Sequence, residues 1–203
     1  MNKFAAATAI ALVGAFSAAS ASAADLIIED TYVSESSTSF TGFYLEVCGG
    51  VTLEADSTYD AGSYPMDMGP AVGVALGMQT PVEGLAVELD LMYAGADYTG
   101  YDYGVYDVAL MANAVYTVPL NDMFELYGQA GVGIVNVTYD SDYSGLGAGF
   151  NVAVGGRVEI IQGLKAFTEF KYTSTFSDVD VDDGNDAIGY PLGTVLVGLR
   201  MEF

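Results

Sequence analysis

Histidine and tryptophan are absent from the 203 residues, and cysteine occurs once, as Cys48. Without histidine the chain cannot build Ser-His nucleophilic chemistry or an ordinary zinc site, so histidine-dependent hydrolases are excluded. A single cysteine cannot form an intramolecular disulfide. Cys48 falls on the polar face of its segment, where a small filler is the commoner role than a reactive thiol. The sequence predicts no cofactor and no catalytic site.

Basic residues are scarce, with five Lys and Arg against 27 Asp and Glu, and the formal charge is -22. All the acids follow Ala23, and one of the five bases, Lys3, precedes it. A chain of this charge repels nucleic acid and anionic lipid surfaces. We therefore expect no nucleic-acid partner.

Long apolar runs are missing after residue 23, where Gly, Asp or Glu interrupts every candidate, so a spanning helix is excluded. Before it, Lys3, the apolar stretch 4–16 and the small-x-small triplet 21–23 form a signal peptide that would be cleaved after Ala23. The alternative is a retained membrane anchor over 4–23. Because Cys48 lies far from this point, lipid anchoring is not expected. Residues 24–39, rich in Ser, Thr and acids, are expected to form a flexible periplasmic tail, and 40–203 the folded domain.

The remaining sequence alternates apolar and polar residues with a period of two, as strands do. In the first such segment Phe43, Leu45 and Val47 take one face, and Tyr44 and Glu46 take the other. The pattern recurs in eight segments: 43–54, 71–78, 85–93, 106–117, 125–134, 150–160, 164–172 and 194–203. Near Val135 and Val137 the phase could shift through a bulge.

The connections between these segments alternate in length. Those at 80–84, 119–122 and 161–163 are tight, whereas 55–68, 94–104, 140–149 and 174–189 are long. Membrane barrels have short periplasmic turns and longer extracellular loops. The sequence thus predicts an all-β fold, an antiparallel up-and-down transmembrane β-barrel of about eight strands, with both termini in the periplasm.

Charged residues segregate onto the polar face of the strands, which suits a barrel with lipid outside, because a charge at the bilayer midplane costs about 2–4 kcal/mol. We expect them to pair inside the barrel. The predicted lumen network is Glu46, Glu88, Asp90, Asp107, Glu125, Arg157, Glu159, Lys165, Glu169, Lys171, Arg200 and Glu202. The alternative is a secreted soluble β-calyx that binds a small ligand, with the apolar face as its core.

Tyrosines gather at the ends of segments that lead into long connections, where amphipathic rings suit a membrane interface. They predict an aromatic girdle of Tyr93, Tyr98, Tyr101, Tyr103, Tyr106, Tyr139, Tyr143, Tyr172 and Tyr190.

Three stretches resemble a known family. Residues 195–203, VLVGLRMEF, resemble the terminal strand of outer-membrane barrels, which ends on an aromatic residue. Residues 110–116, LMANAVY, and 127–133, YGQAGVG, resemble the small eight-stranded family that groups opacity-type proteins with the transmembrane domain of the OmpA class, a porin family. The resemblance covers about 40–203 and implies location in the cell outer membrane. It implies that the barrel assembly machinery recognises the last strand through Val197, Leu199, Met201 and Phe203.

Two sets of carboxylates are candidate sites. Glu88 and Asp90 share a face and could serve acid-base chemistry, but a structural ion-pair network is the commoner role of such pairs. The acidic connection near 180 places oxygen ligands at alternate positions, which suggests weak divalent-cation binding, but it lacks the Gly and Glu of an EF-hand. The candidate ligands are Asp178, Asp180, Asp182, Asp183 and Asp186.

The leading functional expectation is a non-enzymatic outer-membrane barrel with acidic surface loops that has an envelope-structural or surface-binding role. Its expected partners are outer membrane lipid, the barrel assembly machinery and an extracellular ligand or divalent cation. A narrow cation-preferring pore is the alternative, because carboxylates exceed bases on the lumen face.

Overall fold

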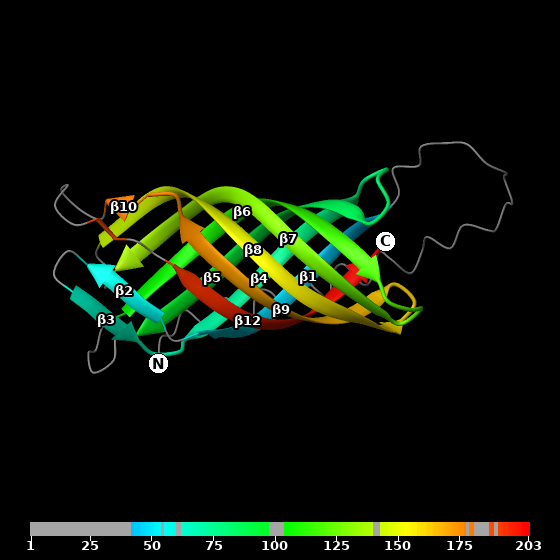
Figure 1. Ribbon diagram of the computed structural model, residues 1–203, viewed down its shortest axis with the longest axis horizontal. Coiled ribbons are helices and arrows are strands. Elements are labelled where there is room, and N and C mark those ends of the chain that lie inside the picture. The colour runs from blue at the N-terminus through cyan, green and yellow to red at the C-terminus, as the bar shows by residue number, and fades with distance from the viewer. Residues whose placement is uncertain are drawn as a thin grey trace, which may run out of the picture. The chain divides into compact units, whose positions relative to one another are not determined.

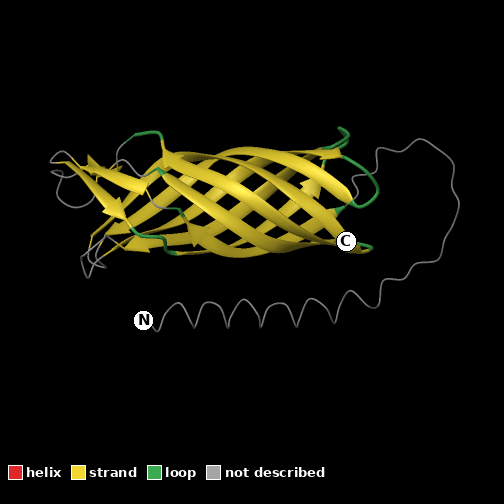
Figure 2. Cartoon of the chain, turned by 60° about the horizontal axis from the view of Figure 1, so that its bottom comes forward, coloured by secondary structure: helices red, strands yellow, loops and turns green. Residues whose placement is uncertain are grey.

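In a computed structural model the protein is a closed antiparallel barrel with the strand order β1-β12-β9-β8-β7-β6-β5-β4 (Figure 1, Figure 2). The structure describes residues 42–53, 55–59, 62–97, 104–139, 143–177, 179–180, 187–188 and 191–203. The barrel strands are β1 (Phe43–Thr52), β4 (Pro70–Gln79), β5 (Leu85–Asp97), β6 (Gly104–Pro119), β7 (Phe124–Tyr139), β8 (Tyr143–Ile161), β9 (Leu164–Thr175) and β12 (Leu192–Glu202). The predicted eight-stranded up-and-down barrel is confirmed, while residues 1–23 and 24–39 lie outside the described part.

The two ends of the barrel differ. At one end β5, β7 and β9 each begin directly after a tight turn, and Gly84 and Gly163 adopt the left-handed backbone that two of these turns require, with φ of 76° and 80°. We call this the short-turn end; the C-terminus lies there (Figure 1). At the other, the long-connection end, lie the hairpin of β2 (Ala55–Tyr59) and β3 (Gly62–Met66) and the pair of β10 (Val179–Asp180) and β11 (Ala187–Ile188).

The predicted long connections are shorter than expected, because strand pairing continues into them. β8 begins at Tyr143, so most of the segment predicted as a loop over 140–149 is strand, and β5 continues to Asp97. Glycines at every second position from 145 to 149 contribute no side chains, so the apolar–polar alternation that indicates a strand is not visible there. Their backbones pair with β7, whose Val135 and Val137 lie opposite Gly147 and Gly145.

The predicted phase shift near Val135 and Val137 is wrong. β7 keeps an unbroken register with both neighbouring strands from Glu125 to Tyr139, and both valines point into the barrel and are fully buried. The register shift recorded in the β8–β9 pairing lies elsewhere, between Glu159 and Ile161.

The outer face of the wall is an apolar belt. Along β7 the outward residues from Phe124 to Ile134 are Phe, Leu, Gly, Ala, Val and Ile. Ten residue steps of about 3.3 Å on a strand tilted by about 40° give a belt about 25 Å tall, the height of the lipid-facing band of membrane barrels. A soluble calyx would turn these side chains inward, so the orientation excludes that alternative.

Aromatic rings mark the long-connection edge of the belt. The ring centroids of Tyr93 and Tyr106 lie 6.1 Å apart, and those of Phe150 and Tyr172 lie 6.2 Å apart. Of the other tyrosines predicted for the girdle, Tyr98, Tyr101, Tyr103 and Tyr190 lie outside the described residues, and Tyr139 and Tyr143 are described in backbone only. In the part of the chain that the structure describes, no helix is long and apolar enough to cross a membrane.

Candidate functional site

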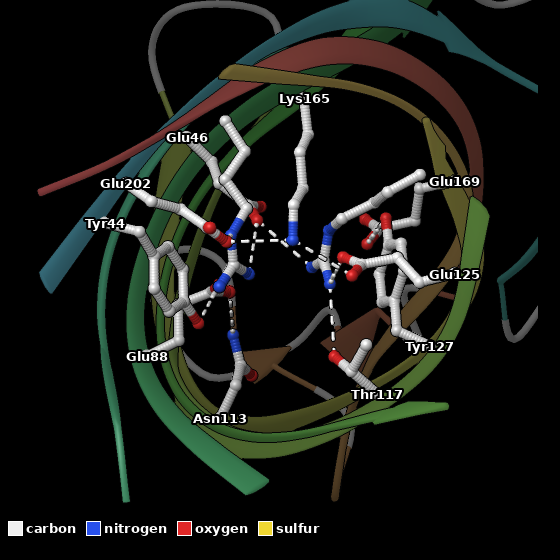
Figure 3. A network of polar contacts seen from close by, with 12 residues as sticks. Tyr44, Glu46, Glu88, Asn113, Thr117, Glu125, Tyr127, Lys165, Glu169 and Glu202 are labelled. Carbon is white, nitrogen blue, oxygen red and sulfur yellow. Dashed lines mark hydrogen bonds and ion pairs between the residues drawn. The ribbon is translucent and has the colours of Figure 1, made fainter. Parts of the chain in front are cut away.

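The interior of the barrel has two sections with different chemistry. The half nearer the short-turn end is filled by charged side chains and by Tyr44 and Tyr127, and we call it the ion-pair section (Figure 3). Its charged residues are Glu46, Glu88, Asp90, Glu125, Arg157, Lys165, Glu169, Lys171, Arg200 and Glu202. The half nearer the long-connection end is mainly apolar, and we call it the apolar section. Its buried apolar residues are Ala71, Met92, Ala94, Ala96, Val105, Ala109, Met111, Val135, Val137, Val179, Leu192 and Leu196. Four buried polar side chains lie at the same level: Thr52, Asp107, Thr173 and Thr194.

Glu46 of β1 lies at the centre of the ion-pair section. Its Oε1 accepts hydrogen bonds from Arg157 Nη2 at 3.1 Å and from Arg200 Nη1 at 3.2 Å. Each guanidinium also stacks on a tyrosine ring: Arg157 lies 3.6 Å from the centroid of Tyr127, and Arg200 lies 3.4 Å from that of Tyr44. Both arginine side chains are almost completely buried, so these contacts replace their hydration.

A second group of contacts joins β5 to β9 across the lumen. Lys171 Nζ lies 2.5 Å from Asp90 Oδ2 and 3.3 Å from Glu169 Oε1. The Tyr127 hydroxyl donates to Glu169 at 2.9 Å. All four side chains are buried. Because every charge here has an oppositely charged or hydrogen-bonding neighbour, the low dielectric of the interior strengthens the pairing.

Glu88 is hydrogen-bonded by neutral side chains. Its carboxylate accepts a hydrogen bond from the Tyr44 hydroxyl at 3.0 Å and one from Asn113 Nδ2 at 3.3 Å. Glu88 and Asp90, the two candidates for acid-base chemistry, are both more than nine-tenths buried. Both carboxylates are therefore engaged by neighbouring side chains within the lumen.

More exposed ion pairs lie at the short-turn mouth of the lumen. Lys165 Nζ lies 3.0 Å from Glu125 Oε2 and 3.2 Å from Glu202 Oε1. Arg200 Nε donates to Glu202 Oε1 at 2.9 Å, and Arg157 Nη1 lies 3.5 Å from Glu125 Oε1. Glu125 and Glu202 thus connect the two arginines to Lys165, and Figure 3 shows these carboxylates on either side of Lys165.

A three-strand unit occurs twice around this section. Tyr44, Gly77 and Glu88 lie opposite one another on β1, β4 and β5. The same order recurs on β7, β8 and β9 as Tyr127, Gly155 and Glu169. In both units the tyrosine ring packs over the glycine, where a Cβ would overlap it, and its hydroxyl donates to the glutamate.

The repeat explains why Asp90 and Lys171 meet. Each lies two residues beyond the glutamate of its own unit, so the two hold corresponding positions in opposite walls. Likewise Glu46 corresponds to Gln129, two residues beyond each tyrosine. The two units thus carry different charges at the same place, which lets them pair across the lumen.

The structure brings together ten of the twelve residues predicted for the lumen network: Glu46, Glu88, Asp90, Glu125, Arg157, Lys165, Glu169, Lys171, Arg200 and Glu202. Asp107 is buried on β6 within the apolar section, between Val105 and Ala109 and opposite Val137, and Glu159 pairs in register with Lys165 near the rim. Sequence reasoning missed Tyr44, Tyr127 and Asn113 as partners of the carboxylates. Their place on the polar face was the available signal.

The other two predicted sites, the assembly signal on the last strand and the acidic divalent-cation site, are separate from the predicted lumen network. On β12, Val197, Leu199 and Phe203 are exposed on the outer face, in phase with Met201. Asp178, Asp182, Asp183 and Asp186 lie outside the described residues, and Asp180 is described in backbone only. Among the described residues no cluster of three or more acidic or sulfur side chains could hold a metal ion.

The ion-pair section contains a small cavity. This cavity, of about 10 Å³, lies among Cys48, Gln129, Phe167 and the central carboxylates. A single water needs about 10–15 Å³, so this cavity is at the lower limit for one water molecule.

Comparisons with known proteins agree with this architecture. A family model described as "Outer membrane protein beta-barrel domain" matches residues 8–203. Among solved structures, Neisserial surface protein A is 13% identical, with a TM-score of 0.61 over 80% of this chain and 97% of its own. The attachment invasion locus protein Ail of Yersinia pestis is 12% identical, with a TM-score of 0.51 over 80% and 99%. A major outer membrane protein of Thermus thermophilus is 14% identical, with a TM-score of 0.51 over 80% and 99%. At such identities the likeness shows the fold alone. None of the curated protein sequences compared with the chain matches it.

Proposed function

Because this chain belongs to the family of outer membrane β-barrel proteins, we propose that it is a closed, non-conducting barrel with an envelope-structural or surface-binding role and no catalytic activity. The observation that carries the proposal is the filled interior. The ion-pair section and the apolar section lie one above the other, so an ion would have to pass both.

The apolar section is the stronger barrier. Val135, Val137 and Leu196 have no exposed surface, and Leu192 and Val179 are nearly as buried. Val179 belongs to β10, so a segment from a long connection contributes to the filling. A hydrophobic constriction excludes water, and an ion that enters without its water loses its hydration energy. We infer that the lumen stays shut to hydrated ions.

The competing function is a narrow cation-preferring pore. Its support is the excess of acids among the residues predicted for the lumen network, which include eight carboxylates and four bases. In the structure six of these carboxylates, Glu46, Glu88, Asp90, Glu125, Glu169 and Glu202, are engaged by the bases, by tyrosines or by Asn113. A cation path would require those contacts to open and the apolar section to separate.

Planar-bilayer recording tests the proposal. Protein folded in detergent and added to the bilayer is expected to give no stepwise conductance. Insertion is verified separately by protease protection of the barrel in vesicles. Steady cation-selective steps from verified inserted protein would overturn the closed barrel in favour of the pore.

The long-connection end supports the surface-binding part of the proposal. The four segments predicted as long connections carry 12 acids and no base, and a single-sign surface attracts counter-charged partners. The barrel would act as a rigid stem that presents this charge outside the cell. Asp178, Asp180, Asp182, Asp183 and Asp186 remain proposed ligands of a weakly bound divalent cation, and calorimetry with millimolar calcium decides that point, since absence of heat excludes it. We also propose that the barrel assembly machinery recognises Val197, Leu199, Met201 and Phe203.

A further inference from the structure

The lipid-facing wall has a hollow of about 510 Å³ over β6, β7 and β8. Its floor consists of three small outward residues, Ala114, Gly128 and Ala130, which lie beside one another because Ala114 is opposite Ala130 in the register. Tyr116 and Val154 stand at its edges, and both are more than half exposed. The hollow is therefore open toward the membrane.

The fold does not require the small residue at the centre of this floor. A Cβ added at Gly128 would meet only the Ala153 carbonyl oxygen, at 3.9 Å, which is ordinary contact, and the φ of Gly128 is not positive. Gly77 and Gly155 differ in this respect, since each lies under a tyrosine ring. Backbone geometry therefore does not explain why position 128 has no side chain.

The repeated unit supplies an internal comparison. On β1, Leu45 and Val47 follow Tyr44 as Gly128 and Ala130 follow Tyr127 on β7. Leu199 lies opposite Val47, as Ala114 lies opposite Ala130. The same place in the first unit is therefore filled by three large side chains, so a barrel of this construction is complete without a hollow.

The hollow lies at acyl-chain depth in the half of the wall nearer the short-turn end. Gly128 is four residues from Phe124, where β7 begins, which places it about 10 Å inside the edge of the belt. The amphipathic ring of Tyr116 lies nearer that edge, beside the turn at Gly84. The hollow is continuous with the lipid-facing belt, so the neighbour that reaches it is lipid.

We propose that this hollow binds one acyl chain of a phospholipid from the leaflet at the short-turn end, with Tyr116 beside the headgroup region. The side chains of Tyr116, Leu126 and Val154 would enclose the chain, and the floor would admit it closer to the barrel axis than elsewhere on the belt. This inference rests on the membrane location of the family and not on whether the lumen conducts.

Native mass spectrometry tests the proposal by counting lipids that stay on the folded protein after incubation in dodecylmaltoside micelles with palmitoyl-oleoyl-phosphatidylethanolamine. The filled variant is Gly128→Leu, Ala130→Val and Ala114→Leu together, which copies the residues of the first unit. The matched control is Gly49→Leu, an outward glycine whose Cβ would meet only the Ala71 carbonyl oxygen, at 3.8 Å. The wild type and the control are expected to retain one phospholipid that the filled variant loses, with half-saturation at least 10-fold higher in the filled variant.

Equal retention by all three proteins would overturn the proposal. So would a wild type that is dimeric where the filled variant is monomeric with unchanged lipid, because the hollow would then be an interface between copies. Folding of each variant is checked by the mobility shift on boiling, and the single change Ala130→Val replaces the triple variant if that one does not fold. None of these readouts involves conductance, so failure here leaves the closed-barrel proposal standing.

Discussion

At the scale of single residues, Glu46 has the most consequential position in the barrel. One carboxylate oxygen accepts from two arginines that come from β8 and β12, so three strands depend on it. The arginines keep other partners, because Arg157 also reaches Glu125 and Arg200 reaches Glu202. Those partners are nearer the rim and more exposed, and they cannot take over the central position.

Replacing Glu46 with Gln should therefore destabilise the barrel by about 3 kcal/mol, because two buried guanidinium groups lose their shared counter-charge. The measurement is the free energy of unfolding by urea in lipid vesicles. Glu159→Gln is the control, since Glu159 lies near the rim and surface substitutions usually change stability by less than about 0.5 kcal/mol. Equal stability of the two variants would show that Glu46 is not central.

The sequence predicts the residues of this network better than their partners. Alternation put Glu46, Arg157 and Arg200 on the inner face, because the period of two is local. It could not show that both arginines contact Glu46, because Arg157 and Arg200 are 111 and 154 positions away from Glu46 in the sequence. Barrel closure determines which inward side chains face one another. The same limit hid Tyr44 and Tyr127, whose rings lie under the guanidinium groups.

At the scale of elements, the barrel depends on tyrosine rings that pack over glycines of the next strand. Gly77 on β4 receives the ring of Tyr44, and Gly155 on β8 receives that of Tyr127. The rings direct each hydroxyl to a glutamate one strand further on, at Glu88 and Glu169. Three neighbouring strands are thereby held in one register in each unit.

Gly77→Ala should cost about 1–3 kcal/mol, because the added methyl overlaps the Tyr44 ring and moves it away from Arg200 and Glu88. Near-ultraviolet circular dichroism and urea unfolding in vesicles measure the effect. Gly128→Ala is the matched control, because its methyl has room and should leave stability nearly unchanged. A Gly77→Ala protein as stable as Gly128→Ala would contradict the packing argument.

Element lengths were harder to predict than element positions. The strand over 143–161 was predicted to begin near residue 150, because glycines at 145, 147 and 149 carry no hydrophobic signal. Pairing with β7 extends it, since the backbone of β7 offers partners as far as Tyr139. Backbone pairing is a tertiary property that residue periodicity does not report.

At the scale of the whole molecule, the barrel is a stem with two stacked fillings. The ion-pair section joins strands through contacts that cross the lumen, and in the proposed closed barrel the apolar section keeps water out. The repeated three-strand unit shows how one construction supplies both walls, with an acid in one unit and a lysine in the other.

Removing the apolar filling should convert the closed barrel into a leaky one. The combined change Val135→Gly, Val137→Gly and Leu196→Ala takes three fully buried side chains out of the constriction and lets water enter. Planar-bilayer recording is expected to show small cation-preferring currents that the wild type lacks. The outward change Val132→Gly on the same strand is the control and should stay silent. Silence from the interior variant too would assign closure to the ion pairs.

By itself the sequence determined the strands, their number, the apolar outer face and the location of the charges, because these follow from a two-residue period and from the low tolerance of lipid for charge. It also determined the short turns, where Gly and Pro mark the chain. Only the tertiary structure decided which charges pair, where the interior changes from ionic to apolar, and where the outer wall is hollow. Those features depend on which strands become neighbours when the sheet closes, and the tilt and register of closure bring together residues that no local pattern relates.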